Sequence, residues 1–95
     1  ICWTSNLLAA KKDYFSDLTS LSHECRNTSQ KFICRRALVL TEVLQHQAGS
    51  NGNYACQSRL LGLGAELMMI SFDSNQHEAL DPMLQEVKMF CKGLW

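Results

Sequence analysis

The sequence has no excess of charge of either sign and no long apolar run. Nine Lys and Arg residues balance nine Asp and Glu residues, so the formal net charge is zero. A neutral chain lacks the attraction that draws basic proteins to nucleic acid or anionic membranes. The longest weakly charged stretch, residues 60–70, contains Glu66 and is far shorter than the ~20 apolar residues of a membrane-spanning helix. We therefore expect no nucleic acid and no membrane span, and a protein as the partner.

Motifs for catalysis and for cofactor binding are also missing. No C-x-x-C pair occurs, and Gly62 and Gly64 lack the G-x-G-x-x-G spacing of a phosphate-binding loop. His23 and Cys25 are two residues apart, which places them on different sides of a helix and prevents both from binding one metal ion. Cys34 has no histidine near it in the sequence that would activate it as a nucleophile. We predict no enzymatic activity, no cofactor and no metal site.

The cysteines leave two interpretations open. The chain has an odd number of cysteines, which are Cys2, Cys25, Cys34, Cys56 and Cys91. Three of them fall in apolar stripes of predicted helices, where a free cysteine packs as a small hydrophobic residue. We therefore expect reduced cysteines and an intracellular, cytoplasmic protein. The alternative is an extracellular protein with two disulfides and one free thiol, and the N-glycosylation acceptor pattern Asn27-Thr28-Ser29 supports it.

Apolar residues recur with the 3.6-residue period of a helix in four segments of the chain. These predicted helices span residues 5–26, 29–48, 54–71 and 80–94. Because the connections between them are short, successive helices should run antiparallel. The predicted fold class is all-α, an antiparallel up-and-down four-helix bundle. Residues 1–95 form one helical domain, and since the chain begins with Ile rather than Met, we expect it to be excised from a larger protein.

Polar residues at segment boundaries predict where the helices begin. Thr28 or Ser29 is expected to cap the second predicted helix, and Asn53 the third. Asp81 followed by Pro82 is expected to open the fourth, because Asp suits the capping position and Pro the first helical position.

Residues 32–45 form the most apolar stretch and are expected to be the centre of the bundle. One apolar line of this helix comprises Ile33, Ala37, Leu40 and Leu44. A second line, about 100° away around the helix axis, comprises Phe32, Val39 and Val43. Two apolar lines predict a helix that is buried on two sides. Replacing Val39 with Ala should then be costly.

A second apolar line on the third predicted helix is the candidate binding surface. It consists of Tyr54, Leu61, Ala65 and Met68 and lies about 90–150° from the inward line of the same helix. One inward line is enough for a bundle, so the second either packs against another helix or remains exposed for a partner. Leu38, on the outer side of the preceding helix, is a smaller exception of the same kind.

These features favour a non-enzymatic protein–protein interaction module, an adaptor or scaffold that binds a helical peptide or a partner domain. Tyrosine and methionine offer adaptable apolar contact and alanine permits a close approach, so the expected partner presents an amphipathic helix. The alternative is a secreted helical signalling (cytokine-like) or carrier protein. Two functions remain open for the arginines Arg35, Arg36 and Arg59, an anion site or ion pairs with acidic neighbours such as Glu42.

Overall fold

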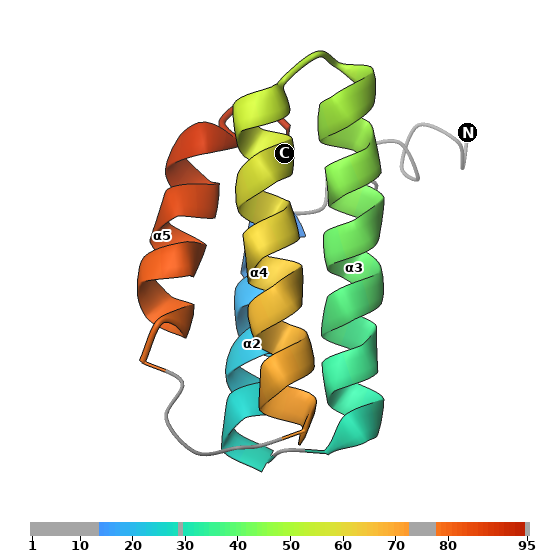
Figure 1. Cartoon of the computed structure of the whole chain (residues 1–95), viewed down its shortest axis with the longest axis vertical. Coiled ribbons are helices and arrows are strands. Elements are labelled where there is room, and N and C mark those ends of the chain that lie inside the picture. Colours follow the sequence, from blue (N-terminus) through green and yellow to red (C-terminus); the bar gives the residue numbers. More distant parts are fainter. Residues whose placement is uncertain (1–13, 29, 73–77, 95) are drawn as a thin grey trace, which may run out of the picture.

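The fold of the chain is all-helical. The computed structural model describes residues 14–28, 30–72 and 78–94. Within them lie the four helices α2 (Tyr14–Thr28), α3 (Lys31–Ser50), α4 (Tyr54–Phe72) and α5 (Leu80–Phe90), which pack side by side as a bundle (Figure 1). The predicted all-α class is confirmed. Residues 5–13 of the first predicted helix and residue 29 of the second lie outside the described residues.

The connection between α3 and α4 follows the local signals of the sequence. Gly52 has a φ of 76°, a left-handed conformation that glycine adopts without steric cost. The side-chain oxygen of Asn53 accepts a hydrogen bond from the backbone N–H of Cys56 at 3.2 Å, so the predicted cap of α4 is confirmed. The Asn53 amide also donates to the carbonyl of Phe90 at 3.1 Å. One residue therefore starts α4 and ties it to the end of α5.

Neither Thr28 nor Asp81 caps a helix as predicted, because their side chains have other partners, and the alternative cap Ser29 lies outside the described residues. Gln30 precedes α3 and makes no side-chain cap hydrogen bond. The Thr28 hydroxyl donates to the carbonyl of Glu24 within α2 and accepts from the backbone N–H of Gln30 at 3.3 Å. The last helix already begins at Leu80, so Asp81 lies in its first turn and faces α2 instead of capping. This helix also ends at Phe90, before the predicted residue 94, and the following turn contains Gly93 at a φ of 94°.

The centre of the bundle is α4, and the prediction that it would be the helix containing residues 32–45 is wrong. Of the described helices, α2 and α4 each contact the other three, and the contacts of α4 are the more extensive, whereas α3 contacts only α2 and α4 (Figure 1). The inward line of α4 is fully buried or nearly so: Cys56, Leu60, Leu63, Leu67 and Ile70. With two neighbours on adjacent sides, α3 buries one line and leaves the other in solvent.

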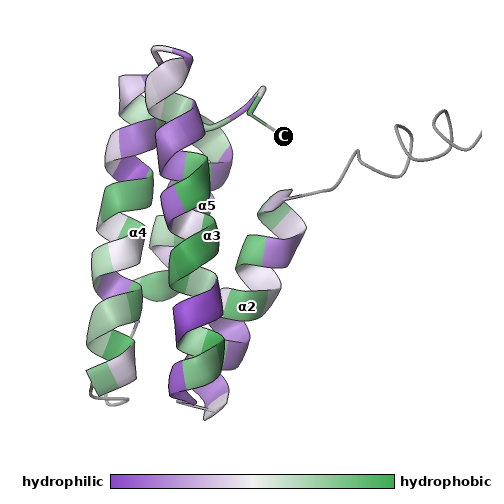
Figure 2. Cartoon of the chain, turned by 90° about the vertical axis from the view of Figure 1, so that its right-hand side faces the viewer, coloured by the Kyte–Doolittle hydropathy of each residue, from purple (hydrophilic) through white to green (hydrophobic). Residues whose placement is uncertain are grey.

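The exposed line of α3 is the one that we expected to be covered. Phe32, Val39 and Val43 are 68%, 52% and 48% exposed. Figure 2 shows apolar turns along the outward side of α3. On the other line Ala37 and Leu44 are buried, while Ile33 and Leu40 are half-buried.

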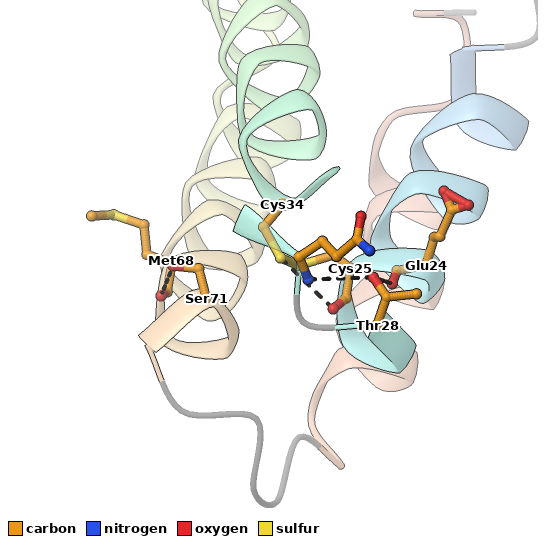
Figure 3. Close-up of a disulfide and its surroundings, with 7 residues drawn as sticks. Glu24, Cys25, Thr28, Cys34, Met68 and Ser71 are labelled. Atoms are coloured by element: carbon orange, nitrogen blue, oxygen red, sulfur yellow. Dashed lines mark hydrogen bonds between the residues drawn. A yellow bond between two sulfur atoms is a disulfide. The ribbon is translucent and has the colours of Figure 1, made fainter. Parts of the chain in front are cut away.

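Two disulfides hold the ends of the helices together. Cys25 at the end of α2 is bonded to Cys34 in α3 (Figure 3), and Cys56 in α4 is bonded to Cys91 just after α5. The expectation of reduced cysteines is wrong for these four, and Cys2 lies outside the described residues. An inward position does not distinguish a free cysteine from a paired one, because inward lines of neighbouring helices face each other. Closing loops of 9 and 35 residues corresponds to about 3 and about 4 kcal/mol in the chain-entropy account.

The different burial of α3 and α4 predicts opposite results for two truncations. Leu63→Ala should lower the free energy of unfolding by about 2–5 kcal/mol, because a fully buried leucine leaves a cavity. Val39→Ala should change it by less than about 0.5 kcal/mol, because Val39 is half in solvent. Urea unfolding of both variants measures the difference. Equal losses would mean that α3 is covered on both sides after all.

Candidate partner-binding surface

The apolar line predicted on the third helix lies at the surface of α4. Tyr54, Leu61 and Met68 are 68%, 54% and 50% exposed, and Ala65 is exposed as well. These residues are exposed because the opposite side of α4 faces the core. In Figure 3 the side chain of Met68 points away from the Cys25–Cys34 disulfide. We call Tyr54, Leu61, Ala65 and Met68 the α4 line. Its role in binding stays a prediction.

Phe72 extends the α4 line and was missed from the sequence. It is the last residue of α4, one turn beyond Met68, and is 80% exposed. The signal was present, because 61, 65, 68 and 72 share one helical period. The predicted helix ends at residue 71, whereas α4 includes Phe72.

Leu38 is partly covered, unlike the members of the α4 line. It is half-buried and packs against the core, on the side of α3 that faces α4. Gly64 of α4 lies opposite, and a Cβ atom at Gly64 would be 3.9 Å from a methyl group of Leu38. A methyl group of Thr41 would be nearer still, at 3.6 Å, and both distances are ordinary van der Waals contacts. Gly64 and Gly62 lie inside a continuous helix and form no loop.

Two open hollows flank α3. The larger encloses about 690 Å³ between α2 and α3, and its lining includes Tyr14, Leu21, Val39, Leu40 and Val43. The smaller encloses about 470 Å³ where the start of α3 meets the end of α4, and it is lined by Lys31, Phe32, Arg35, Leu38, Ser71 and Phe72. The second hollow therefore joins Leu38 to the extended α4 line.

The three arginines considered as an anion site are not gathered in one place. Arg59 lies over the ring of Phe90 at 4.3 Å from its centre, and its Nε is 3.7 Å from a carboxylate oxygen of Glu86. It therefore links α4 to α5, and its acidic neighbour is Glu86 instead of Glu42. Arg36 lies 5.9 Å from the ring centre of Phe32, and Arg35 lines both hollows.

A polar cluster on the surface joins α2 to α5. His23 Nε2 lies 2.8 Å from Asp81 Oδ1, and Arg26 donates to Asp81 Oδ2 at 3.2 Å. The hydrogen bonds from His23 and then from Arg26 lower the pKa of Asp81 below its usual value. His23 is thus engaged in an ion-pair cluster. Cys34, the cysteine that we considered as a nucleophile, is held in a disulfide.

Comparisons with known proteins add no assignment. No protein-family model, no curated protein and no solved structure matches the chain. In the described part of the chain, no His, Cys, Asp and Glu side chains form a group of three that could hold a metal ion. The helices described are also too short or too polar to cross a membrane.

The Asp81 cluster predicts part of the acid sensitivity of the fold. Because the folded-state pKa of Asp81 is lowered, the cluster stabilises the protein above the ordinary value of 3.8 and loses this effect as the pH falls through the folded-state pKa. Asp81→Asn should therefore lose less stability than the wild type between about pH 5 and pH 2. The difference should stay below about 1 kcal/mol, because the Asp81 side chain is 60% exposed.

Urea unfolding at both pH values provides the measurement. Asp17→Asn is the matched control, since Asp17 is an exposed carboxylate in the first turn of α2 and belongs to no ion pair among the described residues. If Asp81→Asn and Asp17→Asn lose the same stability on acidification, the cluster does not contribute.

Proposed function

We propose that this chain is a non-enzymatic helical protein of an extracellular, oxidising compartment, and that it acts by binding a helical segment of a protein partner along the α4 line. The observation that carries the proposal is an apolar line on the exposed side of the central helix, which is contiguous from Leu61 to Phe72 and is separated from Tyr54 by the turn that contains Ser58. Isolated apolar residues on a surface are common, whereas a contiguous line of them is typical of a binding site.

The position of the line on α4 suits a helical ligand. Its residues recur at helical spacing, which matches the anchors of an amphipathic helix laid alongside. Leu60, Leu63 and Leu67 fix α4 from the inside, so the line is formed before the partner arrives. A pre-formed surface loses little conformational entropy on binding.

Two disulfides among the described residues favour the extracellular alternative over the cytoplasmic one. They form and persist in oxidising compartments, where a domain of this size benefits from cross-links. Asn27 of the glycosylation acceptor pattern is exposed at the end of α2, which is compatible with this compartment. A signalling role fits better than carriage of a small molecule, because both hollows flanking α3 are open to solvent.

The helix order belongs to the same proposal. The disulfide Cys25–Cys34 joins the end of α2 to the first turns of α3, and Cys56–Cys91 joins the first turn of α4 to the end of α5. These links and the short turn between α3 and α4 support an antiparallel up-and-down bundle, in which the α4 line is open along its length.

A count of free thiols tests the compartment. Protein made by a secretory pathway and unfolded without reductant should contain one reactive thiol, that of Cys2, because the other four cysteines are bonded. Mass spectrometry after alkylation, before and after reduction, gives the number. Five reactive thiols in protein from the native source would contradict the extracellular assignment and restore the cytoplasmic adaptor.

Substitution of Met68 tests the binding surface. The probe is a synthetic amphipathic helix of about 18 residues, long enough to span the α4 line. Met68→Asp should weaken binding of this peptide at least about tenfold, measured by fluorescence anisotropy, because a carboxylate would be buried in an apolar contact. The melting temperature should stay unchanged, because Met68 is half-exposed.

Met89→Asp is the matched control for this experiment. Met89 lies on α5 and is 62% exposed, so the same substitution there should change neither peptide binding nor stability. The proposal fails if Met68→Asp unfolds the domain, if both variants bind the peptide equally well, or if amide shifts of the bound protein map away from α4.

A further inference from the structure

Aromatic rings and positive charges meet at one end of the α4 line. The smaller hollow beside α3 is built from Lys31, Phe32, Arg35, Leu38, Ser71 and Phe72 and encloses about 470 Å³. We call this hollow the aromatic mouth. The start of α3 lies beside the end of α4 (Figure 1). The hollow lies at these two ends, beyond Met68 in the direction of Phe72.

The apolar part of the mouth has room for one large side chain. Phe32 and Phe72 are 68% and 80% exposed, so both rings offer surface to a ligand. Leu38 is half-buried, packs against the core and forms the inner wall of the mouth. Aromatic side chains around a supported apolar floor are typical of the sites that contribute most to binding free energy.

The charged side chains among the described residues that line the mouth are both positive. Lys31 and Arg35 are exposed and belong to none of the ion pairs of the described residues. The first turn of α3 contains no acidic residue, although the helix dipole favours negative charge there. The hydroxyl of Ser71 is engaged, since it donates to the carbonyl of Met68 at 2.7 Å. The charge complement of the mouth is therefore a carboxylate.

We infer that the aromatic mouth binds the acidic C-terminal turn of the helix that lies along the α4 line. This inference rests on the proposed function and adds the chemistry and the orientation of the partner. An apolar side chain of that turn enters between Phe32 and Phe72, and its Asp or Glu side chains approach Lys31 and Arg35. The C-terminal end of a helix carries the negative end of its dipole, which adds to the attraction.

The charges along α3 restrict the acidic residues to one end of the partner. Glu42 follows Arg35 by seven residues, about 10 Å farther along the helix axis, and is exposed on the same side. A uniformly acidic helix would be repelled there. From Tyr54 to Phe72 the line measures about 27 Å, so a helix of about 18 residues reaches the mouth with its last turn.

Two synthetic helices of about 18 residues test the inference. Both carry the same stripe of Leu and Phe and differ in the last turn, which contains Glu in one peptide and Lys in the other. In low salt the Glu peptide should bind about tenfold tighter, and about 0.5 M salt should remove most of this preference. Fluorescence anisotropy gives the affinities, and amide shifts give the location.

Charge reversal in the protein is the decisive comparison. The double variant Lys31→Glu and Arg35→Glu should reverse the preference and favour the Lys peptide. Lys88→Glu with Lys92→Glu changes the net charge by the same amount at exposed positions in and just after α5, and it should leave the preference unchanged. Circular dichroism of both double variants should match that of the wild type.

The outcomes separate this inference from the proposed function. Equal affinities for the two peptides, with amide shifts along the α4 line, would overturn the acidic mouth and leave the binding surface in place. If both double variants change the preference for the Glu peptide equally, the preference depends only on the net charge of the protein. This result would also overturn the inference. Failure of both peptides to bind at about 1 mM would overturn the inference together with the surface.

Discussion

Burial of the inward line of α4 is the interaction on which the rest of the structure depends. Leu60, Leu63 and Leu67 are fully buried, and each contributes about 1.5–3 kcal/mol when it is removed from water. Of the described helices, α3 and α5 do not contact each other; α2 and α4 both contact the two of them, and α4 does so more extensively. The burial of this line also determines which residues of α4 lie at the surface. Because the inward line faces the core, the α4 line on the opposite side of the helix faces solvent.

The disulfides and the polar contacts fix the positions of the helices along one another, which the apolar core alone does not determine. Leucine packing allows helices to slide along one another, whereas the bonds Cys25–Cys34 and Cys56–Cys91 fix the relative positions of helix ends. Asn53 and Arg59 add directional contacts between α4 and the end of α5. Such additions matter in a small domain, which buries a smaller fraction of its surface than a large one. The result is a rigid frame for the surface of α4.

Local signals in the sequence were sufficient to predict where the helices lie along the chain. They were insufficient to predict which helices pack against one another. The period of the apolar residues predicted α4 to within one residue, and the cap at Asn53 depends only on residues close to it in the chain. Both α3 and α4 carry two apolar lines, and which line is buried depends on how many helices surround each one, which a period does not report. Asp81 failed as a cap for the same reason, because its partners His23 and Arg26 come from a distant helix.

The two exposed apolar lines of the bundle converge at the aromatic mouth. Phe32 begins the outer line of α3, Phe72 ends the extended line of α4, and the side chains of both line the same hollow. A ligand that covers these rings also excludes water from Lys31 and Arg35, and an ion pair is stronger in such surroundings than in bulk solvent. The apolar and the charged contributions therefore reinforce each other at this end of the bundle. Selectivity for an acidic partner would follow from the apolar contact itself, because the same rings that provide affinity lower the local dielectric around the charges.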